Sequence, residues 1–105
     1  MTDTIDIIID TMDITKIEER NAGGTWVIGT FEGYEFQALV FSEHAECESY
    51  ELHNSRISKL WILRNSDKKT AFNFDRGLDI DAIDDAANAI VGFLCSGLAE
   101  FIFGE

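Results

Sequence analysis

The chain has 105 residues and a net charge of −12, with 46% hydrophobic and 27% charged residues. This length predicts one domain with a core of its own, and eight Phe and two Trp residues supply large side chains for that core. The acidic balance argues against direct binding to nucleic acid, whose phosphates it would repel, and favours association with basic protein surfaces.

The N-terminal segment, residues 1–19, carries six acidic residues and one lysine. Residues 4–9 form a short β-branched run, which favours a strand. Ile5, Ile8, Ile9 and Met12 also fit one face of a helix, so strand and helix both stay open for this segment.

A β-meander is predicted over residues 25–74. Its four predicted strands are residues 25–31, 34–41, 57–64 and 69–74. The turn Glu32-Gly33 is of the two-residue hairpin kind, and the residues that follow it alternate cleanly between apolar and polar. Residues 60–63 are apolar on both faces, which predicts that both faces of the sheet are covered there.

The segment between the second and third strands, residues 42–55, is polar and aperiodic. A loop of this length in a small domain is either functional or mobile. His44, Cys47 and His53 stand among glutamates and are weak candidate zinc ligands. A structural zinc site usually recruits two well-spaced ligand pairs, whereas this loop has one compact set, so we expect neither a metal nor a cofactor.

Residues 79–103 are predicted to form one helix, capped by Asp79 or Asp81. Apolar residues recur at spacings of three and four from Ile80 to Phe101, and a second face carries small side chains. The helix is therefore expected to be buried or to form a dimer interface. The predicted fold is α+β, an antiparallel meander of about four strands packed by one long C-terminal helix, in a single domain over residues 1–105.

The same apolar helix raises the question of a membrane span. Only 14 residues, Ala86–Ala99, run without a charge, and a span needs about 20 predominantly apolar residues. Asp3 and Asp6 occupy the place where a secretory signal peptide has its basic region. We therefore expect a cytoplasmic protein that does not contact a membrane.

The sequence contains no familiar catalytic motif. It has no nucleophile elbow, no phosphate-binding glycine loop and no dinucleotide fingerprint. Cys47 has histidines nearby, but the surrounding acids oppose formation of a thiolate. A calcium loop starting at Asp75 fails, because Ile80 and Ala86 stand where Gly and Glu are required. We therefore expect no enzymatic activity.

Three stretches carry short motifs: Trp-x-x-Gly leading into Phe-x-Ala-x-Val, then Arg-Ile-Ser-Lys-Leu, then Phe-Asp-Arg-Gly-Leu. They lie in residues 24–41, 54–62 and 74–79. Together they resemble a family of short bacterial and phage proteins described as a domain of unknown function. The sequence departs from the pattern of that family at Ser55, Phe74 and Leu78, where Gly, Tyr and Trp are usual.

The resemblance implies a bacterial or mobile-element setting and carries no activity. Its recurring polar positions hold Arg56, Ser58, Lys59, Asp75 and Arg76 in this chain. Cross-strand pairing and turn closure account for these residues. The alternative is that Arg56, Lys59 and Arg76 bind an anion.

The charge layout carries the leading hypothesis on function. Residues 32–51 hold six acids and no Lys or Arg, whereas residues 56–76 hold six bases and two acids. We expect an acidic interaction module that binds a basic protein surface, that of a nucleic-acid-binding host protein, as an anti-CRISPR-like anti-defence inhibitor does by mimicking DNA phosphates. The expected contact residues are Glu32, Glu35, Glu43, Glu46, Glu48, Glu51, Asp79 and Asp81. The alternatives are a ligand- or metal-binding accessory domain and a structural module that forms a homodimer through its helix.

Overall fold

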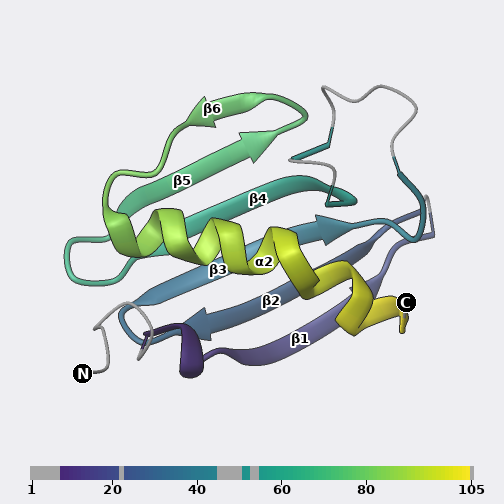
Figure 1. Ribbon diagram of the computed structural model, residues 1–105, viewed down its shortest axis with the longest axis horizontal. Helices are drawn as coiled ribbons and strands as arrows, with labels where there is room; N and C mark the ends of the chain where they lie inside the picture. The colour runs from purple at the N-terminus through teal and green to yellow at the C-terminus, as the bar shows by residue number, and fades with distance from the viewer. Residues whose placement is uncertain (1–7, 22, 45–50, 53–54, 105) are drawn as a thin grey trace.

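A computed structural model of the protein describes residues 8–21, 23–44, 51–52 and 55–104. Figure 1 shows one antiparallel sheet crossed on one face by a long helix. The strand order β1-β2-β3-β4-β5-β6 follows the chain, so every strand pairs with its neighbour in sequence. The elements are β1 (Asp13–Glu19), β2 (Thr25–Phe31), β3 (Tyr34–Val40), β4 (Ile57–Arg64), β5 (Lys69–Asp75), β6 (Leu78–Ile80) and α2 (Asp85–Phe103).

The α+β class and the antiparallel meander are confirmed, but the sheet has six strands and the prediction of about four is wrong. The two strands that the sequence did not predict are β1 and β6, which form the two edges of the sheet. An edge strand gains backbone hydrogen bonds from one neighbour and can leave most of its side chains in water. All three side chains of β6 are exposed, and a register shift between Ile14 and Lys16 interrupts the alternation in β1. Neither strand therefore shows a clear apolar pattern in the sequence.

The N-terminal segment, left open between strand and helix, contains both. Residues 8–10 are helical, and β1 begins at Asp13. Ile8, Ile9 and Met12 pack against the core. The remaining part of the strand predicted at 4–9 lies outside the described residues.

The helix α2 begins later than predicted. Its N-cap is Asp84, whose Oδ1 accepts a 2.7 Å hydrogen bond from the backbone N–H of Ala87. The predicted caps Asp79 and Asp81 lie before the helix, because residues 78–80 pair with β5. Strand pairing occupies the backbone groups that the first helical turn would need, so the helix starts only after the chain has left the sheet.

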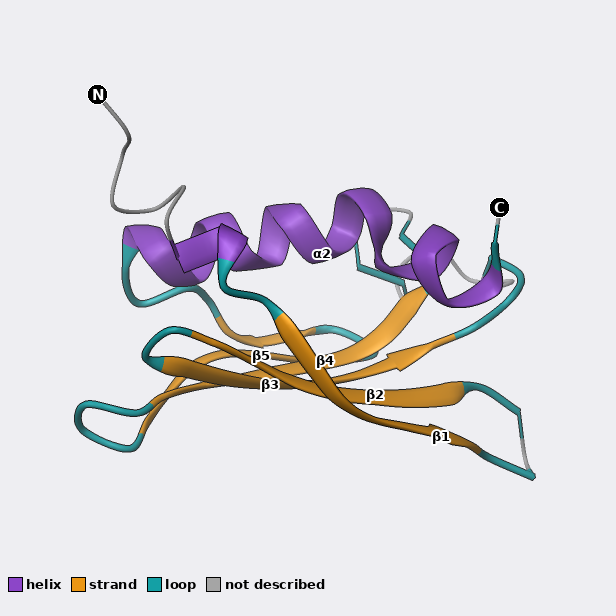
Figure 2. Ribbon diagram, turned by 90° about the horizontal axis from the view of Figure 1, so that it is seen from below, coloured by secondary structure: helices purple, strands orange, loops and turns teal. Residues whose placement is uncertain are grey.

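The hydrophobic core lies between α2 and one face of the sheet, as Figure 2 shows. Ile90, Leu94 and Leu98 of α2 are at most 3% exposed, as the apolar spacing predicted. They meet the inward side chains of the central strands: Val27, Phe36, Ala38, Leu60, Ile62, Phe72 and Phe74. Each fully buried side chain of this kind stabilises the fold by about 1.5–3 kcal/mol. The ends of the predicted stripe differ, because Ile80 lies in β6 and Phe101 is 66% exposed.

The length and composition of α2 would also allow it to cross a membrane, but one such helix is weak support for that role. A helix at the core of a soluble protein has the same properties, and α2 carries its buried stripe against the sheet.

The opposite face of the sheet has no described element over it (Figure 2). The prediction that both faces are covered around residues 60–63 is therefore wrong for the described part of the chain. Trp61 and Leu63 point to this uncovered face and are half-buried by their neighbours in the sheet.

Candidate functional site

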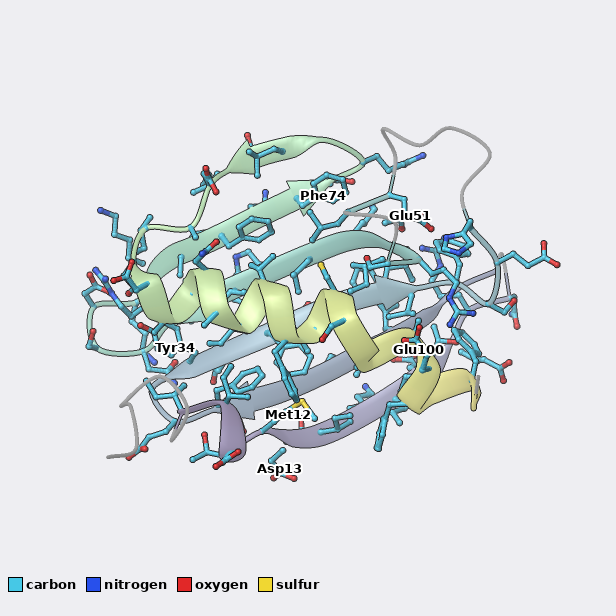
Figure 3. All side chains as sticks on the ribbon, viewed as in Figure 1. Met12, Asp13, Tyr34, Glu51, Phe74 and Glu100 are labelled. Atoms are coloured by element: carbon cyan, nitrogen blue, oxygen red, sulfur yellow. The ribbon has the colours of Figure 1, made fainter. Side chains whose placement is uncertain are left out.

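A pocket of about 580 Å³ opens at one end of the sheet. Its walls come from the turn between β1 and β2, the end of β3, the start of β4, the turn after β5 and Phe103 at the end of α2. Figure 3 labels Glu51 and Glu100 at this end and Tyr34 at the opposite end of β3. The meander thus brings five segments that are distant in sequence to one end.

Four of the eight Lys and Arg side chains line this pocket: Arg20, Arg56, Lys59 and Arg76. Pairing of β4 with β5 places Lys59 opposite Asp75, and the backbone N–H of Arg76 donates a 2.9 Å hydrogen bond to the carbonyl of Ser58. The three candidate anion-binding residues are therefore neighbours in space. Arg20 was missed in the sequence, because it stands alone in an acidic segment and only the sheet brings it to the others.

Arg56 is the buried member of this basic set, with 8% of its surface exposed. Its Nη1 donates a 2.9 Å hydrogen bond to the carbonyl of Ser42, and its guanidinium lies 5.9 Å from the ring centroid of Phe103. Its Nη2 is 3.9 Å from Glu100 Oε1. These contacts hold the positive charge in the wall of the pocket and tie β4 to the end of α2.

The other three bases are less engaged. The Nζ of Lys59 lies 3.5 Å from Asp75 Oδ1, a pair whose carboxylate is 58% exposed. Within the described residues, Arg20 and Arg76 have no carboxylate at ion-pair distance. Both guanidinium groups are therefore available to a ligand.

The acidic side of the pocket differs from the prediction. Glu51 was expected on an exposed binding surface, but it is only 8% exposed. The Nδ1 of His44 lies 2.9 and 3.1 Å from its two carboxylate oxygens. The carboxylate of Glu51 is buried beside the imidazole, so it presents little charge to a large partner. Glu19 and Glu43 also line the pocket and are exposed.

Metal binding finds no support in the described part of the chain, where no group of three or more His, Cys, Asp or Glu side chains is placed to hold an ion. Of the weak zinc candidates, only His44 is described; Cys47 and His53 lie outside the described residues. Burial raises the pKa of the remaining cysteine, Cys95, whose thiol lies 3.9 Å from the carbonyl of Leu52. That thiol is protonated at neutral pH and is a poor nucleophile.

The remaining predicted contact acids that the structure describes lie at separate places on the sheet. Glu32 lies in the turn between β2 and β3 and Glu35 on the uncovered face, both exposed. Asp79 accepts a 2.9 Å hydrogen bond from Asn73 at the β6 edge, and Asp81 accepts one from the N–H of Ala82. Glu46 and Glu48 lie outside the described residues.

The uncovered face of the sheet is the second notable surface. Cross-strand register places Ile28, Gln37, Trp61 and Asn73 in one row, with Trp26 in the next. Trp26, Ile28 and Trp61 are all half-buried, and Trp61 Nε1 lies 3.4 Å from Thr70 Oγ1. The result is an aromatic and aliphatic centre on a face that the described residues leave open to solvent.

Fold and sites together define a sheet-and-helix domain with a mixed-charge pocket at one end and an apolar face on the outside. The chain belongs to the family described as Domain of unknown function (DUF7678), which matches residues 25–99. The match runs from β2 into α2 and includes Arg56, Lys59 and Arg76, whereas Arg20 precedes it. The resemblance to an uncharacterised family is confirmed at this level, and the bacterial or phage setting stays a prediction. No curated protein and no solved structure matches the chain.

Proposed function

We propose that the protein is an interaction module that binds a basic surface of another protein through the uncovered face of its sheet. The observation that carries the proposal is the position of Trp26 and Trp61, half-buried in adjacent rows of a face with no described element over it. Protein interfaces are rich in aromatic residues at their centre and polar at their rim. Such aromatic anchors supply much of the binding energy.

The rim of this face is acidic. Asp13 and Glu35 flank Thr30 in one cross-strand row, and both are exposed. Neither has a base at ion-pair distance in the described part of the chain, whereas Lys16 is paired with Glu18 at 3.4 Å. A partner with an apolar centre and basic surroundings would match both features.

The net charge of −12 acts over longer distances and would speed the encounter with such a partner. The sequence favours one specific form of this function, a phage-type anti-defence inhibitor that occupies the basic nucleic-acid groove of a host protein. In that form the carboxylates replace DNA phosphates, and the affinity falls steeply with salt. A cytoplasmic setting, expected from the sequence, would place the module beside such hosts.

The proposal is tested by affinity capture from bacterial lysate at low and high salt, followed by measurement of the Kd for each captured protein. Three forms are compared: wild type, the double variant Asp13→Asn/Glu35→Gln, and the matched double variant Asp81→Asn/Asp85→Asn, whose two acids are exposed before and at the start of α2. The two variants lose the same charge, but only the first changes the rim of the uncovered face. We expect a salt-sensitive partner that the rim variant binds at least roughly tenfold more weakly, equivalent to about 1.4 kcal/mol.

A Trp61→Thr variant, checked for folding by circular dichroism, tests the apolar centre in the same way and should also lose the partner. Equal affinity in the rim variant and the Asp81→Asn/Asp85→Asn variant would refute the assignment to this face. Affinity that does not change with salt would refute the charge-mimicry form.

A second candidate function, a homodimer through α2, is favoured by two exposed aromatic residues on that helix. Phe93 and Phe101 are 40% and 66% exposed. Sedimentation equilibrium decides this, since a mass equal to the monomer at all concentrations removes the dimer. If a dimer forms, Phe101→Ser should dissociate it, because buried aromatic residues dominate such interfaces.

A further inference from the structure

We propose that the pocket between the end of β3 and the start of β4 binds a small organic phosphate. Lys59, Arg76 and Arg20 would hold the phosphate, and Phe41 and Phe103 would contact the organic part. This site adjoins the uncovered face, because Leu39 and Lys59 stand in the same cross-strand row as Trp26. It would take a different ligand through basic side chains, and it does not depend on the interaction proposed there.

The availability of positive charge is the first argument. Arg20 and Arg76 have no ion-pair partner in the described residues, and the pairing of Lys59 with the exposed Asp75 is of a kind worth only about 0–1 kcal/mol. A phosphate can displace that partner at small cost. Three cations in the lining of one pocket suit a dianion with three acceptor oxygens, because guanidinium groups hydrogen-bond phosphate in a bidentate manner.

The backbone conformation is the second argument. Arg56, Lys68 and Arg76 are the three residues other than glycine with positive φ in the described chain, at 67°, 57° and 53°. Glycine adopts this region without the penalty of about 1–2 kcal/mol that other residues incur. Two of the three place a guanidinium in the same pocket. Strained residues cluster at functional sites, which is consistent with a ligand role for these arginines.

The size and lining of the pocket are the third argument. A volume of about 580 Å³ lies within the range of roughly 300–1,000 Å³ for small-molecule sites. It exceeds the need of a bare phosphate, and Leu39, Phe41 and Phe103 supply apolar wall. A Cβ on Gly24 would stand 3.0 Å from both Leu39 Cδ1 and Phe41 Cζ, so glycine lets the backbone lie close against this wall.

The overall acidity of the protein does not overrule these local charges. Screening reduces interactions between exposed charges beyond about 8 Å at physiological ionic strength. The pocket bases therefore act on a bound anion more strongly than carboxylates outside the pocket do. Glu19 and Glu43 line the pocket and oppose anion binding, but both are exposed, so solvent and salt weaken their effect. Glu51, the buried acid of the pocket, directs its carboxylate to His44.

The experiment is a titration of the ¹⁵N-labelled full chain with phenyl phosphate, followed by amide chemical shifts. The amides of Gly23, Gly24 and Ser58 line the pocket and should shift in a saturable manner with one common Kd. Benzoate tests a monoanion of similar shape, and benzyl alcohol tests the ring without charge. We expect phenyl phosphate to bind more tightly than benzoate, and benzyl alcohol to give no saturable shift.

Arg76→Gly and Lys68→Gly form a matched pair for this titration. Each removes one positive charge and places glycine at a positive-φ position, but only Arg76 lines the pocket. We expect Lys68→Gly to bind like wild type and Arg76→Gly to bind roughly tenfold or more weakly, the usual effect of losing a hydrogen bond to a charged group. Equal weakening in the two variants, benzoate binding as tight as phenyl phosphate, or no saturable shift in the folded wild type would each overturn the proposal.

Discussion

The hydroxyl group of Tyr34 donates a 2.8 Å hydrogen bond to Oδ2 of Asp84, across a sequence separation of 50 residues. The same oxygen accepts a 3.0 Å bond from Nη1 of Arg64, while Oδ1 caps α2 through the N–H of Ala87. One carboxylate therefore joins β3, the end of β4 and the first turn of the helix. This contact sets where α2 starts and how it meets the sheet.

Removal of this carboxylate should destabilise the fold. We expect Asp84→Ala to lower the free energy of unfolding by about 2–3 kcal/mol, because it removes an N-cap, the acceptor of the Tyr34 hydroxyl and one of the carboxylate partners of Arg64. Asp81→Ala, at one of the caps favoured by the sequence, should change it by less than about 0.5 kcal/mol. Urea denaturation of both variants checks this, and an equal loss in the two would contradict the role of Asp84.

Acid should weaken the protein through the same group. Burial alone would raise the pKa of Asp84, but hydrogen bonds from Ala87, Tyr34 and Arg64 outweigh burial and hold the pKa below its usual value. The resulting stabilisation is present above the unfolded-state pKa of about 3.9 and is lost as the pH falls through the folded-state pKa. In Asp84→Asn, the unfolding free energy should depend less on pH in this acidic range. Denaturation curves over a pH series test this, and an unchanged acid dependence would count against it.

Alkaline pH should act on Tyr34. Burial, together with the hydrogen bond to Asp84 and its negative charge, raises the pKa of Tyr34 to about 12. Because the folded-state pKa is the higher one, the stabilisation is complete below the unfolded-state pKa of about 10 and is lost as the pH rises through 12. Phenolate absorbance in a Tyr50→Phe background should show the raised pKa directly. A midpoint near 10 in the folded protein would show that the contact with Asp84 is not made in solution.

At Arg76, the residue that is best for stability should differ from the residue that is best for phosphate binding. Arg76→Gly should raise the free energy of unfolding by up to about 1 kcal/mol, since glycine adopts this conformation without strain. Lys68→Gly should have a similar effect, and thermal unfolding measures both. A less stable Arg76→Gly protein would mean that the arginine side chain supports the fold, and the argument from backbone strain would then fail.

Two glycines should respond in opposite directions to alanine. A Cβ on Gly29 would lie 2.5 Å from the carbonyl oxygen of Asp13 and 2.7 Å from the ring of Phe36, so Gly29→Ala should cost about 1–3 kcal/mol. Gly92 is exposed on α2 with nothing near its Cβ position, so Gly92→Ala should stabilise the protein by about 0.5–1 kcal/mol. Chemical denaturation distinguishes them, and stabilisation by both would indicate that β1 does not lie against Gly29.

Local patterns predicted the middle of this chain well. The strands expected at 25–31 and 57–64 have those bounds, and the hairpin turn falls at Glu32-Gly33 as expected. The alternation of apolar and polar residues and the residue preferences of turns depend on neighbours in sequence, so both can be recognised before the fold is known. The sequence did not predict the edge strands β1 and β6 or the late start of α2. Their positions depend on pairing with a neighbouring strand and not on the pattern of their own side chains.

The candidate site, too, could be predicted from the sequence only in part. The sequence singled out Arg56, Lys59 and Arg76 as a possible anion-binding set, and the register of β4 with β5 brings them into one pocket. It did not identify Arg20, which enters that pocket only through the turn between β1 and β2. An exposed Glu51 was also expected, whereas its carboxylate is buried and lies 2.9 Å from Nδ1 of His44. Long-range contacts leave no periodic signal in the sequence.

By itself, the sequence determined the acidic character of the protein, its α+β class, four of its strands and the buried stripe of its helix. These features follow from composition and from spacing along the chain, which do not depend on what lies across the fold. Tertiary structure alone decided that one sheet face has no described cover, that Asp84 caps the helix, and that four bases meet in one pocket. Each of these depends on residues that are distant in sequence and adjacent in space, where burial and strand register act together.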